Sequence, residues 1–76
     1  MDVNVIKSII AKHAKIDEKS LNLDARFKED LHLDSIDLFQ IVMEVEEKYN
    51  IKVDDKDLLY IKTVKDALDK IENAKN

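Results

Sequence analysis

The sequence of 76 residues contains no cysteine, no glycine and no proline. Without cysteine, the chain itself cannot form disulfide bonds, thiolate zinc sites or a cysteine nucleophile, so any thiol chemistry needs a thiol from another molecule. Without glycine and proline, tight hairpin turns and glycine-rich phosphate loops are disfavoured. These absences favour an all-α fold.

Long apolar segments are also absent. The longest unbroken apolar run is Leu58 to Ile61, far shorter than the roughly 20 residues that cross a membrane. The polar residues Asp2 and Lys7 occupy the N-terminal region, where a signal peptide would be continuously apolar. We therefore expect no membrane insertion and a cytoplasmic location.

Charge is unevenly distributed along the chain. The net charge is −4 at pH 7, and residues 34 to 50 account for all of it, with five acidic residues against one lysine. Because nucleic acids require basic residues, this segment disfavours nucleic acid and favours protein partners with basic surfaces. A solvated acidic face that only keeps the chain soluble explains such a cluster equally well.

Apolar periodicity predicts a small four-helix bundle, with three main helices and one short helix, in a single domain over residues 1–76. The expected helices are Asp2 (as N-cap) to about Ala14, Ser35 to Tyr49 with Asp34 or Ser35 as N-cap, a short one near Asp55 to Ile61, and Thr63 to about Asn73. Thr63 and Asp66 are spaced like a capping box, which supports the last start.

The segment of residues 15–33 shows no stable period, although apolar residues are scattered through it. We expect a long ordered loop between helices one and two, pinned by its apolar side chains and with room for a short helical turn. A connection of this length in a small domain often serves function.

The helix predicted over residues 35–49 has two apolar sides. One side forms a core stripe of Leu38, Ile41, Val42, Val45 and Tyr49. The other carries Ile36, Phe39 and Met43 together with Gln40, Glu46 and Glu47. An apolar strip with an acidic border is typical of a transient docking surface. Alternatively, Phe39 folds over the edge of the core and only Ile36 and Met43 are exposed.

Ser35 stands at the start of this helix. A serine at such a position is most often only a cap, but a helix N-terminus also favours a phosphate group. The surrounding stretch DLHLDSIDLFQIVMEVEEKYNIKVDD, residues 30–55, resembles the attachment region of acyl carrier proteins. Asp34, Ser35, Ile36 and Asp37 match the attachment motif, with Ile in place of the usual Leu, and the likeness extends from Val3 to Ile71.

Several positions depart from the pattern of that family. His32 stands where a glycine is common, so the turn that enters the helix is expected to differ. Gln40 replaces a frequent glutamate, Leu38 replaces a smaller polar residue, and Val53 and Asp54 stand where proline often occurs. None of these changes touches the serine.

The resemblance implies a non-catalytic, stand-alone carrier of the fatty-acid-synthesis type. A phosphopantetheinyl transferase would attach 4′-phosphopantetheine from coenzyme A to Ser35, and acyl groups would be held as thioesters on the thiol of that arm. The carrier, expected to be a monomer without a metal site, would present them to synthesis enzymes with basic docking surfaces. The residues that those enzymes would recognise are Asp34, Ile36, Asp37, Phe39, Gln40, Met43, Glu46 and Glu47.

Members of that family also shelter the acyl chain in an apolar cleft between helices. The candidate lining residues in this sequence are Leu38, Ile41, Val45, Leu58, Ile61 and Leu68. A core that opens for an acyl chain agrees with the scarcity of large aromatic residues, which are two phenylalanines, two tyrosines and no tryptophan.

Other readings of the sequence stay open. Carriers for polyketide synthesis or D-alanine transfer share the same architecture, and an adaptor protein would share it with Ser35 unmodified. A hydrolase built on His32 and Ser35 is disfavoured, because the chain has no glycine for an oxyanion turn. A metal site at Asp54, Asp55 and Asp57 is also disfavoured, because their spacing does not match a calcium loop.

Overall fold

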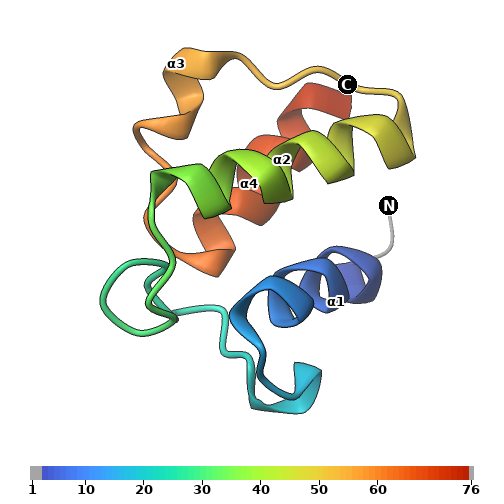
Figure 1. Cartoon of the computed structure of the whole chain (residues 1–76). Coiled ribbons are helices and arrows are strands. Elements are labelled where there is room, and N and C mark those ends of the chain that lie inside the picture. Colours follow the sequence, from blue (N-terminus) through green and yellow to red (C-terminus); the bar gives the residue numbers. More distant parts are fainter. Residues whose placement is uncertain (1–2, 76) are drawn as a thin grey trace.

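The computed structural model describes residues 3–75 and consists of helices joined by loops (Figure 1). The elements are α1 (Val3–Ala14), the 3-10 helix η1 (Glu18–Ser20), α2 (Ser35–Tyr49), α3 (Asp55–Leu58) and α4 (Val64–Lys75). Helix α1 packs against both α2 and α4, while the short α3 follows the far end of α2 and leads into α4. This arrangement confirms the predicted all-α bundle of three main helices and one short helix.

The bounds of α1 and α2 agree with the prediction, although Asp2, the expected cap of the first helix, lies outside the described residues. Helix α3 ends at Leu58 and not at Ile61, because the following N–H groups turn back to carbonyls three residues earlier, as Ile61 N does to Leu58 O at 3.3 Å. The last helix begins at Val64 and continues past the predicted end to Lys75.

The predicted capping box before α4 is confirmed. The Asp66 N–H donates to Thr63 Oγ1 at 3.2 Å, and the Thr63 N–H donates to Asp66 Oδ2 at 3.1 Å. The same carboxylate oxygen also accepts from the Lys62 N–H at 3.0 Å. One carboxylate therefore satisfies two backbone donors at the start of this helix.

The core lies where α1, α2 and α4 meet. Its largest fully buried side chains are Ile6, Ile10, Ile41, Val45, Val64 and Ile71. Each such side chain contributes about 1.5–3 kcal/mol through removal from water. Tyr49, predicted in the core stripe of α2, is only half-buried at its edge.

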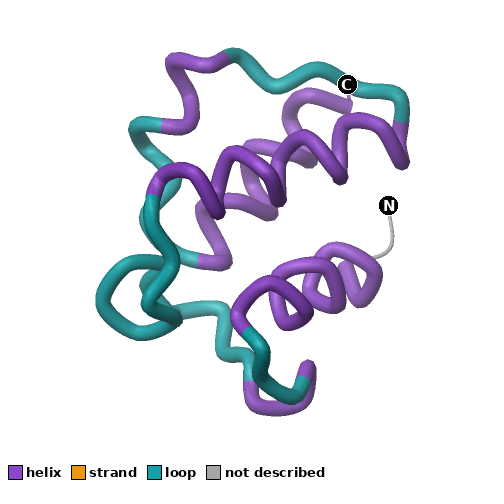
Figure 2. The backbone as a smooth tube through the Cα atoms, in the orientation of Figure 1, coloured by secondary structure: helices purple, strands orange, loops and turns teal. Residues whose placement is uncertain are grey.

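The segment between α1 and α2 is mostly loop, with the short helix η1 near its start (Figure 2). Leu21, Phe27 and Leu33 are buried in the core, whereas Leu23 stays exposed. The backbone of residues 23–27 pairs with that of residues 62–65: Phe27 N donates to Lys62 O at 2.9 Å, Val64 N to Ala25 O at 3.0 Å, and Lys65 N to Leu23 O at 2.9 Å. The expected pinned loop is thus confirmed, with η1 as its helical turn.

Among residues 3–75, no helix is both long enough and apolar enough to cross a lipid bilayer.

Candidate functional site

The start of α2 is capped by Asp34 and not by Ser35. The Asp34 carboxylate accepts from the Asp37 N–H at 3.0 Å, and the Asp37 carboxylate accepts from the Asp34 N–H at 3.1 Å, which makes a reciprocal capping box. Ser35 is the first residue inside the helix and is exposed. Its hydroxyl is therefore not used as the helix cap and is accessible to another molecule.

The electrostatics of this turn follow from the capping box. The hydrogen bond from the Asp37 backbone N–H holds the pKa of Asp34 below its ordinary value, and partial desolvation opposes this only in part. Asp34 therefore carries a negative charge at neutral pH, directly beside Ser35. The positive end of the helix dipole stabilises that charge.

The turn that enters α2 has a left-handed residue. His32 adopts φ of 56°, a region that glycine occupies without a steric penalty. A glycine, which is common at this position in the family that the sequence resembles, would therefore fit the same backbone conformation. His32 does not require a turn different from one that contains glycine. The left-handed conformation at a histidine costs about 1–2 kcal/mol.

A pocket of about 240 Å³ opens beside Ser35, between the start of α2, the end of α3 and the long loop. Three of the six predicted cleft residues line it, namely Leu38, Leu58 and Ile61. The rest of its lining is Phe27, Lys28, Glu29, Leu33, Asp34, Leu59 and Lys62. The other predicted cleft residues lie elsewhere: Ile41 and Val45 are fully buried in the closed core, and Leu68 is half-buried on α4.

A second, more apolar depression of about 390 Å³ lies on the other side of Ser35. It is lined by Ser35, Ile36, Leu38, Phe39, Asp55, Leu58 and Leu59. Ser35, Leu38, Leu58 and Leu59 line both cavities, so the two cavities adjoin at the serine. Phe27, Leu33 and Leu59 were not among the predicted site residues. Phe27 and Leu59 are distant from Ser35 in the sequence and come near it only through the tertiary fold, whereas Leu33 is two residues from the serine in a segment without stable periodicity.

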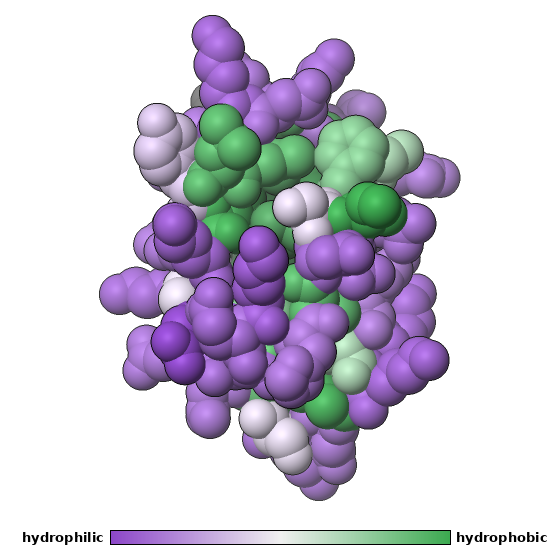
Figure 3. Space-filling view, turned by 60° about the vertical axis from the view of Figure 1, so that its left-hand side comes forward, coloured by the Kyte–Doolittle hydropathy of each residue, from purple (hydrophilic) through white to green (hydrophobic). Residues whose placement is uncertain are grey.

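The apolar strip on α2 is exposed, as the docking interpretation requires. Ile36 is 68% exposed, Phe39 46% and Met43 50%, so Phe39 does not fold over the edge of the core. Helix α3 and the turn after it add Leu59 and Tyr60, both strongly exposed. Figure 3 shows apolar side chains gathered in the upper half of one face of the molecule, between polar ones.

The acidic border of the strip is less uniform than the sequence suggests. Gln40 and Glu47 are exposed, but the Glu46 carboxylate accepts a hydrogen bond from the Val53 N–H at 2.7 Å. Asp34 and Asp37 bind each other's backbone in the capping box. Among the acids of the predicted partner face, Glu47 is therefore the one whose carboxylate forms no hydrogen bond or ion pair in the described part of the chain.

Two of the three acids considered for a rival metal site, Asp54 and Asp57, have structural partners as well. Asp54 caps α3 by accepting from the Lys56 N–H at 3.1 Å, and Asp57 lies 3.6 Å from the ammonium of Lys70. The same ammonium lies 5.9 Å from the ring centroid of Tyr60. Lys70 thus ties α3 and the turn after it to α4.

The chain is similar to known proteins over most of its length. The family described as "Phosphopantetheine attachment site" matches residues 4–71, a region that contains Ser35. A protein of Onion yellows phytoplasma (strain OY-M) named "Acyl carrier protein" is 48% identical over 63 residues, which cover 83% of each chain. One of the same name from Helicobacter hepaticus (strain ATCC 51449 / 3B1) is 37% identical over 70 residues, 92% of each chain. A third, from Cyanophora paradoxa, is 39% identical over 66 residues, which cover 87% of this chain and 64% of that one.

Proposed function

Since the chain belongs to the acyl carrier protein family, whose prosthetic group is 4′-phosphopantetheine, we propose that Ser35 is the residue to which this group is attached. Carriers of this family hold acyl groups as thioesters, and fatty acid synthesis is the usual role of the stand-alone members. The arm would supply the thiol that a chain without cysteine lacks.

The observation that carries the proposal is that the helix cap and the free hydroxyl at the start of α2 belong to two different residues. Asp34 caps the helix, which leaves the exposed Ser35 hydroxyl available to a transferase. A phosphodiester at that hydroxyl sits at a helix N-terminus, where backbone N–H groups and the helix dipole favour negative charge. The two cavities that meet at Ser35 give an attached arm an apolar surface on either side.

Intact mass measurement tests the site directly. The protein is incubated with coenzyme A, magnesium and a broad-specificity phosphopantetheinyl transferase, beside Ser35→Ala and the control Ser8→Ala on the exposed side of α1. We expect one phosphopantetheine on the wild type and on Ser8→Ala, and none on Ser35→Ala. No gain on folded, initially unmodified wild type would instead support an adaptor with a free serine.

The protein itself would present the acyl group to other enzymes and would not catalyse a reaction. In this proposal it is a cytoplasmic monomer that transferases and synthesis enzymes recognise. The docking surface in this proposal is the strip of Ile36, Phe39 and Met43 with its border of Asp34, Asp37, Gln40, Glu46 and Glu47. Apolar contact would supply affinity, and acidic residues would steer partners whose docking surfaces are basic.

Charge reversal at Glu47 tests this surface, because its carboxylate has no structural role that a lysine would disturb. Glu47→Lys is expected to slow acyl transfer to partner enzymes at low salt, and high salt should reduce the difference because it screens exposed charges. Glu72→Lys, an equal change at an exposed position of α4, serves as control. Equal rates for both variants and the wild type at low salt would contradict the proposed surface.

Shelter of the acyl chain is the remaining part of the proposal. Leu38, Leu58 and Ile61 line the pocket beside Ser35, and Ile41, Val45 and Leu68 would come into contact with a longer chain only if the core opened. Longer acyl chains should then raise the thermal stability of the loaded carrier. A melting temperature independent of chain length would count against the cleft.

A further inference from the structure

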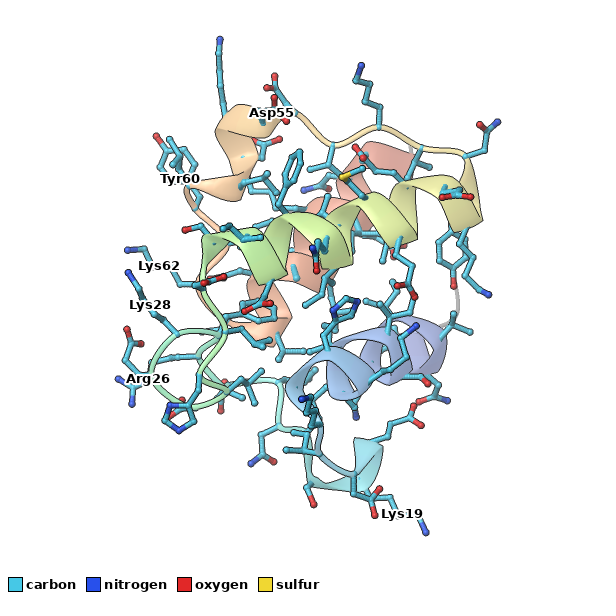
Figure 4. All side chains as sticks on the ribbon, in the orientation of Figure 1. Lys19, Arg26, Lys28, Asp55, Tyr60 and Lys62 are labelled. Carbon is cyan, nitrogen blue, oxygen red and sulfur yellow. The ribbon has the colours of Figure 1, made fainter. Side chains whose placement is uncertain are left out.

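Two lysines stand at the mouth of the pocket beside Ser35. Lys28, from the long loop, and Lys62, from the segment before α4, both line this pocket together with the serine. Their side chains are exposed and extend in the same direction from neighbouring parts of the backbone (Figure 4). Residues 34 residues apart in sequence thus bring two positive charges to one place.

The backbone under these lysines is fixed although their side chains are exposed. The Phe27 N–H, next to Lys28, donates to the Lys62 carbonyl at 2.9 Å. The Lys62 N–H in turn donates to the Asp66 carboxylate at 3.0 Å. The spacing of the two lysine backbones is therefore set by hydrogen bonds and not by chance contact of long side chains.

Neither ammonium has an anionic partner in residues 3–74. The pocket also contains the acids Glu29 and Asp34, but each has its own partner. Glu29 Oε2 lies 3.6 Å from Nε of Arg26, and the Asp34 carboxylate accepts from the backbone at the start of α2. Lys28 and Lys62 form no ion pair with them or with any other described residue. The pocket mouth therefore holds two cations without a counter-ion.

We propose that Lys28 and Lys62 form an anion site for the phosphodiester that would join the arm to Ser35. The inference rests on the proposed attachment at Ser35. Ammonium groups are compact point charges that bind phosphate oxygens well, and the serine lines the same pocket as both lysines. Their attraction would bias the start of the arm toward this pocket and away from the exposed strip of α2. Lys28 and Lys62 are positioning residues in this role.

The test compares the melting temperatures of the modified and unmodified forms at low salt. The variants are Lys28→Gln/Lys62→Gln, the conservative Lys28→Arg/Lys62→Arg, and the matched control Lys19→Gln/Lys48→Gln. Both control lysines are exposed: Lys19 lies in η1, and Lys48 lies in the last turn of α2, at the opposite end of that helix from Ser35. Because exposed pairs are weak individually, we expect Lys28→Gln/Lys62→Gln to reduce the gain in melting temperature on modification by about 4 °C. The arginine variant and the control should keep the wild-type gain, and about 1 M salt should remove the difference.

Intact mass separates failure of this inference from failure of the proposed function. If the arm is attached at Ser35 but all variants gain equally in melting temperature, the lysine site is wrong and the attachment stands. If the arm is not attached, both proposals fall. If Lys28→Arg/Lys62→Arg reduced the gain in melting temperature as much as Lys28→Gln/Lys62→Gln, the inference would also be overturned, because an anion site requires positive charge and not the packing of lysine.

Discussion

Replacement of Asp66 by alanine should destabilise the protein, because two backbone N–H donors lose their hydrogen-bond acceptor. The carboxylate accepts from the Lys62 N–H at 3.0 Å and from the Thr63 N–H at 3.1 Å, and the methyl group of alanine accepts neither bond. Loss of a helix cap costs about 0.5–2 kcal/mol, and loss of two bonds to a charged acceptor places this case near 2 kcal/mol. For a domain of this size we expect the melting temperature to fall by about 10 °C.

The pH dependence of this stabilisation has a definite sign. Partial burial raises the pKa of Asp66, but hydrogen bonds from the Lys62 and Thr63 N–H groups outweigh it, so the pKa lies below its ordinary value of 3.8. A group whose pKa is lower in the folded state stabilises the fold above its unfolded pKa. The contribution is therefore complete at neutral pH and is lost as the pH falls from 3.8 through the folded value.

Urea unfolding followed by far-ultraviolet circular dichroism measures both effects. The control is Asp69→Ala, which removes an exposed carboxylate from the same helix and should shift the midpoint little. The difference in urea midpoint between the wild type and Asp66→Ala should become smaller as the pH is lowered below 3.8. Equal midpoints for the two variants, or a gap that does not change with pH, would refute the assigned role of the carboxylate.

Three further predictions concern stability. His32→Gly should stabilise the fold by about 0.5–1 kcal/mol, because glycine adopts the left-handed φ of 56° without steric strain, although it loses more chain entropy on folding. A melting temperature no higher than that of the wild type would contradict this. Ile41→Ala, at a side chain 1% exposed, should cost about 2–5 kcal/mol in urea, whereas Ile36→Ala, at 68% exposed, should cost under about 0.5 kcal/mol. Glu46→Ala should cost about 1–3 kcal/mol through the lost 2.7 Å hydrogen bond, and Glu47→Ala almost nothing; equal effects would show that this bond does not contribute.

The helices were largely predictable because their signals are local. The bounds of α2 follow from its two apolar faces and from the acids at its start, and the Thr63 and Asp66 pair marks the start of α4 by spacing alone. The end of α3 was predicted three residues too late. The apolar residues that follow Leu58 resemble a helix in composition, but the chain continues there in single turns.

The shape of the site was less predictable because it depends on contacts between distant segments. Nothing local to Lys28 or Lys62 indicates that the backbones beside them pair, and the burial of Phe27 and Leu33 next to Ser35 follows from the same pairing. Glu46 looks like one more surface acid in the sequence, and only the path of residues 50–54 brings the Val53 N–H to it. Ser35 could be proposed from the sequence alone, because the motif around it is local and specific.

The exposed apolar strip of α2 also bears on how the protein behaves at high concentration. Ile36, Phe39 and Met43 are exposed to water on a molecule of net negative charge, and this charge opposes contact between copies of the molecule at neutral pH. That repulsion disappears near the isoelectric point of about 5.1. Mild acidification should therefore promote reversible self-association through this strip well before the carboxylates that cap the helices are protonated.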